Sequence, residues 1–264
     1  MYTFNYHRPD SLASAKALHG DAEDALYLAG RHTLLPSMKQ RLRQPSDVID
    51  LSGIAELRAI TVDKQAVTIG ALATHDEVAR NAQIRGAISA LTVLAGGIGD
   101  AQVRNRGTIG GSLANNDPAA DYPAAVLGLG ATILTDEREI AADDFFTGMF
   151  ETDLGDNELI KAVRFPIPQA AAYVKFPNPA SRYATVGVMI ARTASGTRVG
   201  ITGAAPCAFR AREMESALDG NFAPSSLDGI SLDPDDMNAD LHASAEYRAH
   251  LCVVMAKRAV SQIA

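Results

Sequence analysis

The sequence predicts an α+β protein, and three observations lead to that class. Short helical and strand patterns alternate through residues 1–165. After Pro166-Ile167-Pro168 the pattern changes to a meander of apolar strands. A long helical pattern at Ser244–Ile263, apolar on one face, closes the chain. The predicted strands of the second part are Tyr173–Phe176, Ala184–Arg192 and Thr197–Ala204.

The elements of the first part follow from local signals. Thr74 and Glu77 form a capping box that begins a helix ending near Asn81. Residues 58–62 and 66–70 alternate around a turn like a hairpin. The other expected elements are helices at Asp10–Leu18, Leu34–Arg43, Ile88–Ala95 and Phe209–Leu218, and strands at Ala25–Ala29 and Asp47–Leu51.

Composition excludes several classes of function. A net charge of −7 and a pI near 5.3 argue against a nucleic-acid surface. The first residues have no signal-peptide pattern, and the longest apolar run, roughly Pro123–Leu134, is too short to span a bilayer, so we expect a cytoplasmic protein without a membrane span. Cys207 and Cys252 form no CxxC pair, so no metal site is expected in this chain.

Two loops have the composition of an anion site. Residues 95–125 are rich in glycine, and Gly110-Gly111 allows the amides of residues 108–112 to converge on a phosphate. The segment AGRHTLLP, residues 29–36, leads from a strand into a helix and offers a second set of amides. Neither a Walker A pattern nor G-x-G-x-x-G after a strand occurs. Two such loops suggest a clamp for the pyrophosphate of a flavin dinucleotide.

These two segments resemble the flavin-binding motifs of a known family. AGRHTLLP and IGDAQVRNRGTIGGSLANNDPAADYPAA (98–125) are similar to those of the medium, FAD-carrying subunit of carbon-monoxide-dehydrogenase-type molybdenum hydroxylases, relatives of xanthine dehydrogenase. The segments 157–166, 181–188 and 244–260 also resemble that family. The resemblance implies a vanillyl-alcohol-oxidase (PCMH)-type FAD-binding domain over 1–167, with α/β subdomains at about 1–56 and 57–167. A smaller C-terminal α+β domain with an antiparallel sheet is expected over 168–264.

The resemblance also implies a function and partners. In this family a large molybdopterin subunit oxidises the substrate, a small subunit relays electrons through [2Fe-2S] clusters, and the flavin subunit passes them to an external acceptor. This chain would be that flavin subunit, with non-covalent FAD, in an assembly expected to be a dimer of heterotrimers. Substrate and acceptor are not specified by the sequence. The alternatives are a stand-alone FAD-dependent oxidase or reductase of the same fold, and a structural subunit that has lost FAD.

Site residues follow by position, and no catalytic or metal-binding residue is expected. The pyrophosphate is expected between two loops, with Asp117 and Asp121 near the nucleotide and ribityl hydroxyls. Ile160 matches a family residue that makes an apolar contact with the flavin ring, and Lys175 matches a cation at the pyrimidine edge of the ring. Tyr183 is expected either to lie against the ring face or to be plain core. The expected loop residues are Ala29, Gly30, Arg31, His32, Thr33, Leu34, Gly107, Thr108, Gly110, Gly111 and Ser112.

Arg31 departs from the family pattern, which has a glycine there. If that position has a positive φ, an arginine costs about 1 kcal/mol or more. If the backbone is ordinary, the side chain adds a cation beside the phosphates. By contrast, a bulky residue at Gly110 or Gly111 is expected to abolish FAD retention and leave the fold largely intact.

Overall fold

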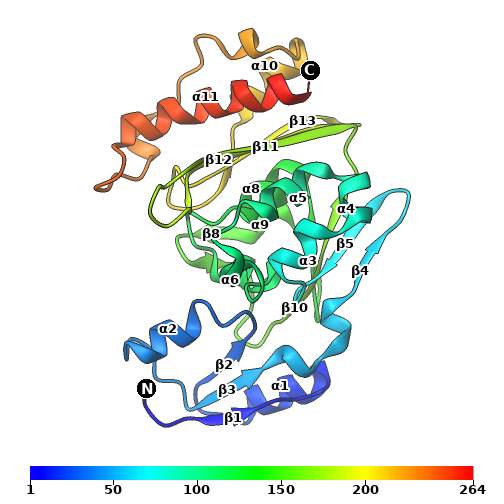
Figure 1. Cartoon of the computed structure of the whole chain (residues 1–264), viewed down its shortest axis with the longest axis vertical. Helices are drawn as coiled ribbons and strands as arrows, with labels where there is room; N and C mark the ends of the chain where they lie inside the picture. Colours follow the sequence, from blue (N-terminus) through cyan, green and yellow to red (C-terminus); the bar gives the residue numbers. More distant parts are fainter. Residues whose placement is uncertain (264) are drawn as a thin grey trace.

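The computed structural model describes residues 1–263 as an elongated molecule in three stacked parts (Figure 1). The N-terminal part lies at one end, and the C-terminal sheet with its two helices lies at the other. The middle part, residues 60–166, contacts both. Each part has a buried apolar core of its own, and the largest of these clusters fills the middle part.

The N-terminal part is built on a three-stranded parallel sheet in the order β1-β3-β2. Its central strand is buried at all four residues, and Ile49 packs with Leu51, Ile54 and Leu57 against Ala15 of the first helix. Burial of the central strand is typical of parallel sheets. The elements are β1 (Asn5–His7), α1 (Leu12–Gly20), β2 (Ala25–Leu28), α2 (Leu34–Lys39) and β3 (Asp47–Asp50), followed by 3₁₀ turns at Leu51–Gly53 and Ala55–Arg58.

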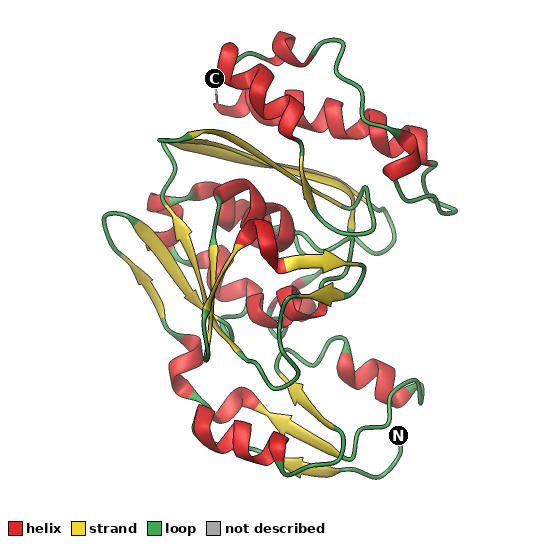
Figure 2. Ribbon diagram, turned by 180° about the vertical axis from the view of Figure 1, so that it is seen from behind, coloured by secondary structure: helices red, strands yellow, loops and turns green. Residues whose placement is uncertain are grey.

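The middle part contains a five-stranded antiparallel sheet in the order β4-β5-β10-β6-β7, with helices packed beside it (Figure 2). The strands are β4 (Ile60–Val62), β5 (Ala66–Gly70), β6 (Thr132–Thr135), β7 (Glu139–Ala141) and β10 (Ile160–Pro166). The helices are α3 (His75–Arg80), α4 (Ala82–Ala87), α5 (Ser89–Gly96), α6 (Ala101–Arg104), α7 (Ile109–Asn115), α8 (Tyr122–Leu129) and α9 (Ala142–Phe145). A small hairpin consists of β8 (Phe146–Gly148) and β9 (Glu151–Thr152).

The C-terminal sheet is covered on both faces. Along β12, Val186, Val188 and Ile190 join the core under α10 and α11, whereas Met189 and Ala191 point into the core of the middle part. This period of two follows from the alternation of side chains along a strand. The elements are β11 (Ala170–Pro177), β12 (Ala184–Thr193), β13 (Gly196–Thr202), β14 (Phe209–Arg210), α10 (Arg212–Gly220) and α11 (Ala245–Ile263), with 3₁₀ turns at Pro224–Leu227 and Pro234–Asp236.

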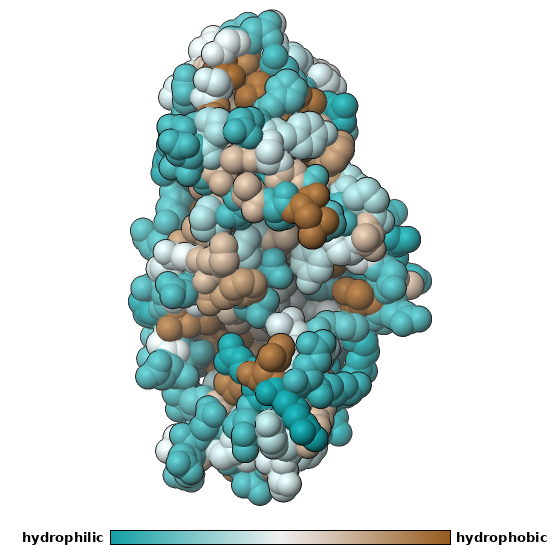
Figure 3. Space-filling model, turned by 90° about the vertical axis from the view of Figure 1, so that its left-hand side faces the viewer, coloured by the Kyte–Doolittle hydropathy of each residue, from teal (hydrophilic) through white to brown (hydrophobic). Residues whose placement is uncertain are grey.

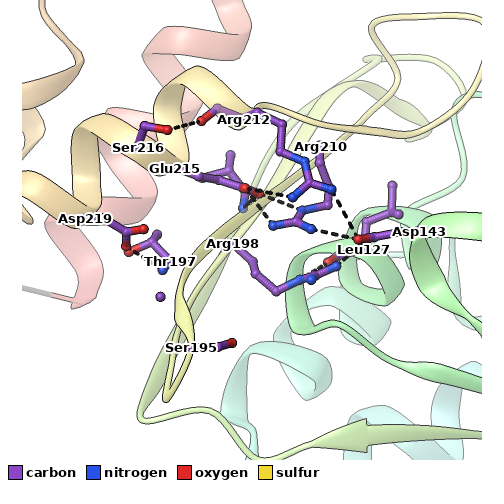
Figure 4. Close-up of polar contacts among 12 residues, drawn as sticks. Leu127, Asp143, Ser195, Thr197, Arg198, Arg210, Arg212, Glu215, Ser216 and Asp219 are labelled. Atoms are coloured by element: carbon purple, nitrogen blue, oxygen red, sulfur yellow. Dashed lines mark hydrogen bonds and ion pairs between the residues drawn. The ribbon is translucent and has the colours of Figure 1, made fainter.

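An ion-pair network joins the middle part to the C-terminal sheet (Figure 4). Asp143 of α9 accepts from Arg198 of β13 at 2.6 Å and from Arg210 of β14 at 2.8 Å. Arg210 also donates to Glu215 of α10 at 2.6 Å, and Glu215 in turn accepts from the amide of Val199. The network therefore fixes α10 and the sheet edge to the middle part at the same place.

The predicted α+β class and the C-terminal antiparallel sheet are confirmed, and several element limits differ. The helix expected to run to Arg43 ends at Lys39, and the one expected from Phe209 begins as strand β14. Strand β10 ends at Pro166 and strand β11 begins at Ala170, close to the predicted boundary at residue 167. The domain limits themselves stay predictions. Within the described residues, no helix is long and apolar enough to cross a membrane.

Candidate functional site

A cleft of about 570 Å³ is lined by residues of the N-terminal part, the middle part and the β11–β12 loop. Figure 3 shows one face of the molecule, on which apolar side chains interrupt the hydrophilic surface mostly near the middle. Most of the predicted site residues line this cleft. They are Ala29, Gly30, Arg31, His32, Thr33, Leu34, Gly107, Thr108, Gly110, Gly111, Ser112, Asp117, Asp121, Ile160 and Tyr183.

The first loop, residues 29–34, has free backbone donors. Between β2 and α2, the amides of Ala29 through Thr33 donate to no other backbone group within residues 1–263. Thr33 precedes α2 without a side-chain cap. A Cβ at Gly30 would lie 2.8 Å from both the Arg106 carbonyl oxygen and the Gly107 Cα, so the two loops touch at this glycine. Free amides beside a cleft are the donors that an anion such as a pyrophosphate needs.

The second loop is arranged differently from the expectation. Thr108 precedes α7, and its hydroxyl accepts from the Gly111 amide at 3.2 Å. The amides of Ile109 and Gly110 donate to carbonyls of the segment after β5, and the Ser112 amide donates to the Thr108 carbonyl. These amides are therefore used within the protein and do not converge on a ligand. What this loop offers the cleft is the Thr108 and Ser112 hydroxyls and close backbone approach at its glycines.

Arg31 has a left-handed backbone, with φ at 70°. Its guanidinium lies 2.5 Å from the carboxylate of Asp50, a fully buried side chain on β3. Burial alone would raise the pKa of Asp50, yet hydrogen bonds from Tyr6 and Ser52 together with Arg31 hold it below its usual range. The arginine therefore combines the cost of a strained backbone with a partner for a buried charge.

Replacing this residue by the family's glycine tests both effects. Arg31→Gly relieves about 1 kcal/mol of backbone strain but leaves the Asp50 carboxylate without its cation. Losing one partner of a buried ion pair costs about 3 kcal/mol, and the cost is smaller here because Arg31 is partly exposed. We expect a net loss of about 1 kcal/mol in the free energy of unfolding, measured with urea. In the Asp50→Asn background the same change should be stabilising. Equal stability of Arg31→Gly and the native chain would contradict the contribution of the ion pair.

Asp121 and Lys175 form a buried ion pair beside the cleft. The Lys175 ammonium lies 2.9 Å from the Asp121 carboxylate and also donates to the Gly97 carbonyl at 3.1 Å. The Tyr173 hydroxyl donates to the same carboxylate at 2.5 Å. Burial raises the pKa of Asp121, and the lysine and tyrosine oppose that rise. Asp121 lines the cleft, whereas Lys175 lies behind it and is not among the lining residues.

Tyr183 stands between two cavities. The residue is 48% exposed, so the interpretation as plain core is wrong. Together with Asp117 and Ser181, it lines both the cleft and a second cavity of about 380 Å³ beside β12 and α11. Burial raises its pKa, as do the nearby charges of Asp117 and Asp121. Ile160, at the start of β10, is 6% exposed and supplies an apolar part of the cleft wall.

His75 also lines the cleft, although it is not among the site residues predicted from the sequence. It is the first residue of α3 and is 5% exposed. Its Nδ1 atom is buried and has no hydrogen-bond partner among residues 1–263. The capping box at Thr74 could have indicated it, because His75 directly follows this N-cap residue. Thr74 forms a β-bridge with Thr108, which brings His75 next to the second loop. No cluster of three or more His, Cys, Asp or Glu side chains that could hold a metal occurs among the described residues.

Comparison with known proteins gives concordant results. Residues 2–168 match the family model described as "FAD binding domain in molybdopterin dehydrogenase". The chain is 34% identical to the carbon monoxide dehydrogenase medium chain of Hydrogenophaga pseudoflava, covering 98% of this chain and 96% of that one. It is 30% identical to the nicotine 6-hydroxylase medium subunit of Paenarthrobacter nicotinovorans, with 97% and 95% covered. A chain of cyanide-inactivated Cu,Mo-CO dehydrogenase superposes with a TM-score of 0.89 at 33% identity, covering 98% and 97%.

Proposed function

Because this chain belongs to the FAD-binding medium subunits of the CO dehydrogenase-type molybdenum hydroxylases, we propose that it carries electrons through FAD from a partner subunit to an external acceptor. It is an oxidoreductase subunit of that family. The electrons would come from the [2Fe-2S] clusters of a small subunit, and these would be reduced by a large molybdopterin subunit. The dimer of heterotrimers, and the cytoplasmic location, stay predictions.

The observation that carries this proposal is the set of free amides at Ala29–Thr33 facing a cleft with the hydroxyls of Thr108 and Ser112. These residues fit a pyrophosphate, since uncharged donors compensate its charge without burying a cation. Asp117 would accept from nucleotide or ribityl hydroxyls, and Ile160 would contact the flavin ring. When bound, FAD would supply the redox chemistry that the side chains lack.

Lys175 and Asp121 would influence the flavin jointly. The lysine pairs with Asp121, so the carboxylate that lines the cleft is neutralised by a cation that does not line it. Lys175 would still place a positive charge near the ring, which favours an anionic reduced flavin. Tyr183, exposed at the junction of the two cavities, is free to lie against the ring face.

The proposal is tested first on the purified full chain. We expect the visible absorbance of a flavin and its release into solution by trichloroacetic acid, because no residue is assigned to a covalent flavin bond. Colour left in the protein pellet would contradict non-covalent binding. A folded chain that binds no flavin would instead favour the structural subunit without FAD.

A second measurement concerns partners. A tag on the chain in its native host should recover a large molybdenum-cofactor subunit and a small [2Fe-2S] subunit. Substrate turnover by the chain alone would favour the stand-alone oxidase or reductase. The names of the relatives given above refer to different substrates. We therefore expect the large molybdenum-cofactor subunit to determine the substrate of the complex.

A further inference from the structure

The His75 ring is a buried polar group without a partner beside the cleft. No side-chain hydrogen bond of the ring occurs within residues 1–263, and Nδ1 is enclosed by the protein. Nε2 lies on the side of the ring that faces Gly107, where a Cβ would come within 2.5 Å of it. The backbone around it is well fixed, since the His75 amide donates to the Gly107 carbonyl at 3.0 Å. A buried ring nitrogen without a hydrogen-bond partner is unusual in a folded protein.

The surroundings make this imidazole neutral. Burial lowers the pKa of His75 to about 4, and the nearby charges of His32 and Arg104 add to the effect. The ring packs on Tyr122, with centroids 5.4 Å apart. A neutral imidazole carries one N–H donor and one acceptor lone pair.

The two nitrogens differ in what they can contact, and this difference favours one tautomer. Nδ1 is enclosed without a partner, while Nε2 is the more open nitrogen. An enclosed N–H without an acceptor is rarer and more costly than an enclosed lone pair without a donor. These surroundings favour the tautomer with the proton on Nε2, in a residue that lines the cleft.

We propose that His75 binds FAD directly, donating from Nε2–H to its pyrophosphate at the contact between the two loops. Gly107 covers the ring from the second loop, and a Cβ at Gly30 of the first loop would lie 2.8 Å from the Gly107 Cα, so the imidazole lies where both loops meet. A neutral donor suits this position, because it compensates phosphate charge without the desolvation cost of a buried cation. The inference rests on the proposed FAD function and adds a phosphate ligand to it.

The experiment compares three ligands on the full chain by isothermal titration: FAD, ADP, which retains the pyrophosphate, and riboflavin, which lacks it. In His75→Leu we expect Kd for FAD and ADP to rise roughly ten- to a hundredfold, the range for one hydrogen bond to a charged group. Riboflavin affinity should stay unchanged. His75→Gln, whose amide can donate from nearly the same place, should remain within about threefold of the native Kd.

Two further measurements separate ligand binding from packing. Tyr122→Phe removes a neighbouring buried hydroxyl that also has no partner and should leave all three affinities unchanged. In nitrogen NMR of the histidine-labelled native chain, the Nε2 resonance of His75 should shift when ADP is added, which a merely structural ring would not show. Native-like ADP affinity in His75→Leu, or an ADP-insensitive resonance, would overturn the inference. A native chain that binds none of the three ligands would instead refute the FAD function itself.

Discussion

Gly111→Leu is expected to abolish FAD retention while the chain remains folded. A Cβ at this position would lie 3.0 Å from the Thr108 hydroxyl oxygen and 3.7 Å from the Ala29 Cβ, so a longer side chain extends between the two loops. We expect Kd to rise by at least about a hundredfold, or about 2.8 kcal/mol. The measurement is FAD titration of the apo chain, with the melting temperature followed in parallel.

The two glycines of the pair are not equivalent, and this divides the expectation drawn from the sequence. At Gly110 a Cβ would lie 2.5 Å from the Ala71 Cβ and 2.8 Å from its carbonyl oxygen. Gly110→Ala therefore crowds the core and should lower stability by about 1–3 kcal/mol, so that the fold is not spared. Gly86→Leu is the matched control for Gly111→Leu, because no atom of the described residues outside its own helix backbone lies within 4 Å of a Cβ at Gly86. Native FAD affinity in Gly111→Leu would show that the loop does not contact the cofactor.

Lys175→Met is expected to cause the largest loss of stability. The change leaves the Asp121 carboxylate, 4% exposed, with the Tyr173 hydroxyl as its one side-chain partner in the described part of the chain. Breaking a buried pair on one side costs about 3–5 kcal/mol in the free energy of unfolding, measured with urea. Lys257→Met is the matched control, because the same change at the exposed pair with Asp228 should cost at most about 1 kcal/mol.

The pH dependence of this variant gives an independent check. Burial raises the pKa of Asp121 above its unfolded value, and loss of the lysine raises it further. Asp121 then binds a proton at a higher pH in the folded state than in the unfolded state. The loss of stability in Lys175→Met is therefore complete above the folded pKa of Asp121, and it becomes smaller as the pH falls through that pKa. The double variant Asp121→Asn, Lys175→Met should recover most of the loss. A deficit that does not change with pH would mean that lost packing, not charge, causes it.

The sequence by itself determined the fold class and the two loop motifs on which the candidate site was predicted. Apolar runs separated by turns predicted the C-terminal strands, and the capping box at Thr74 predicted the start of α3. The two loop motifs, residues 29–36 and 98–125, both line one cleft. The strands and helix starts depend on neighbouring residues, which is why they can be predicted from local patterns. The meeting of the two motifs at one cleft depends on the fold.

Only the tertiary structure decided how the two loops can be used. It shows that the amides of Ile109–Ser112 are already bonded, that Arg31 takes a positive φ and pairs with Asp50, and that Lys175 reaches the cleft through Asp121. It also brings His75 beneath Gly107. Each of these facts depends on a partner elsewhere in the chain or on the local backbone conformation. A motif specifies which donors and charges are present, but burial and distant partners determine which of them remain free for a ligand.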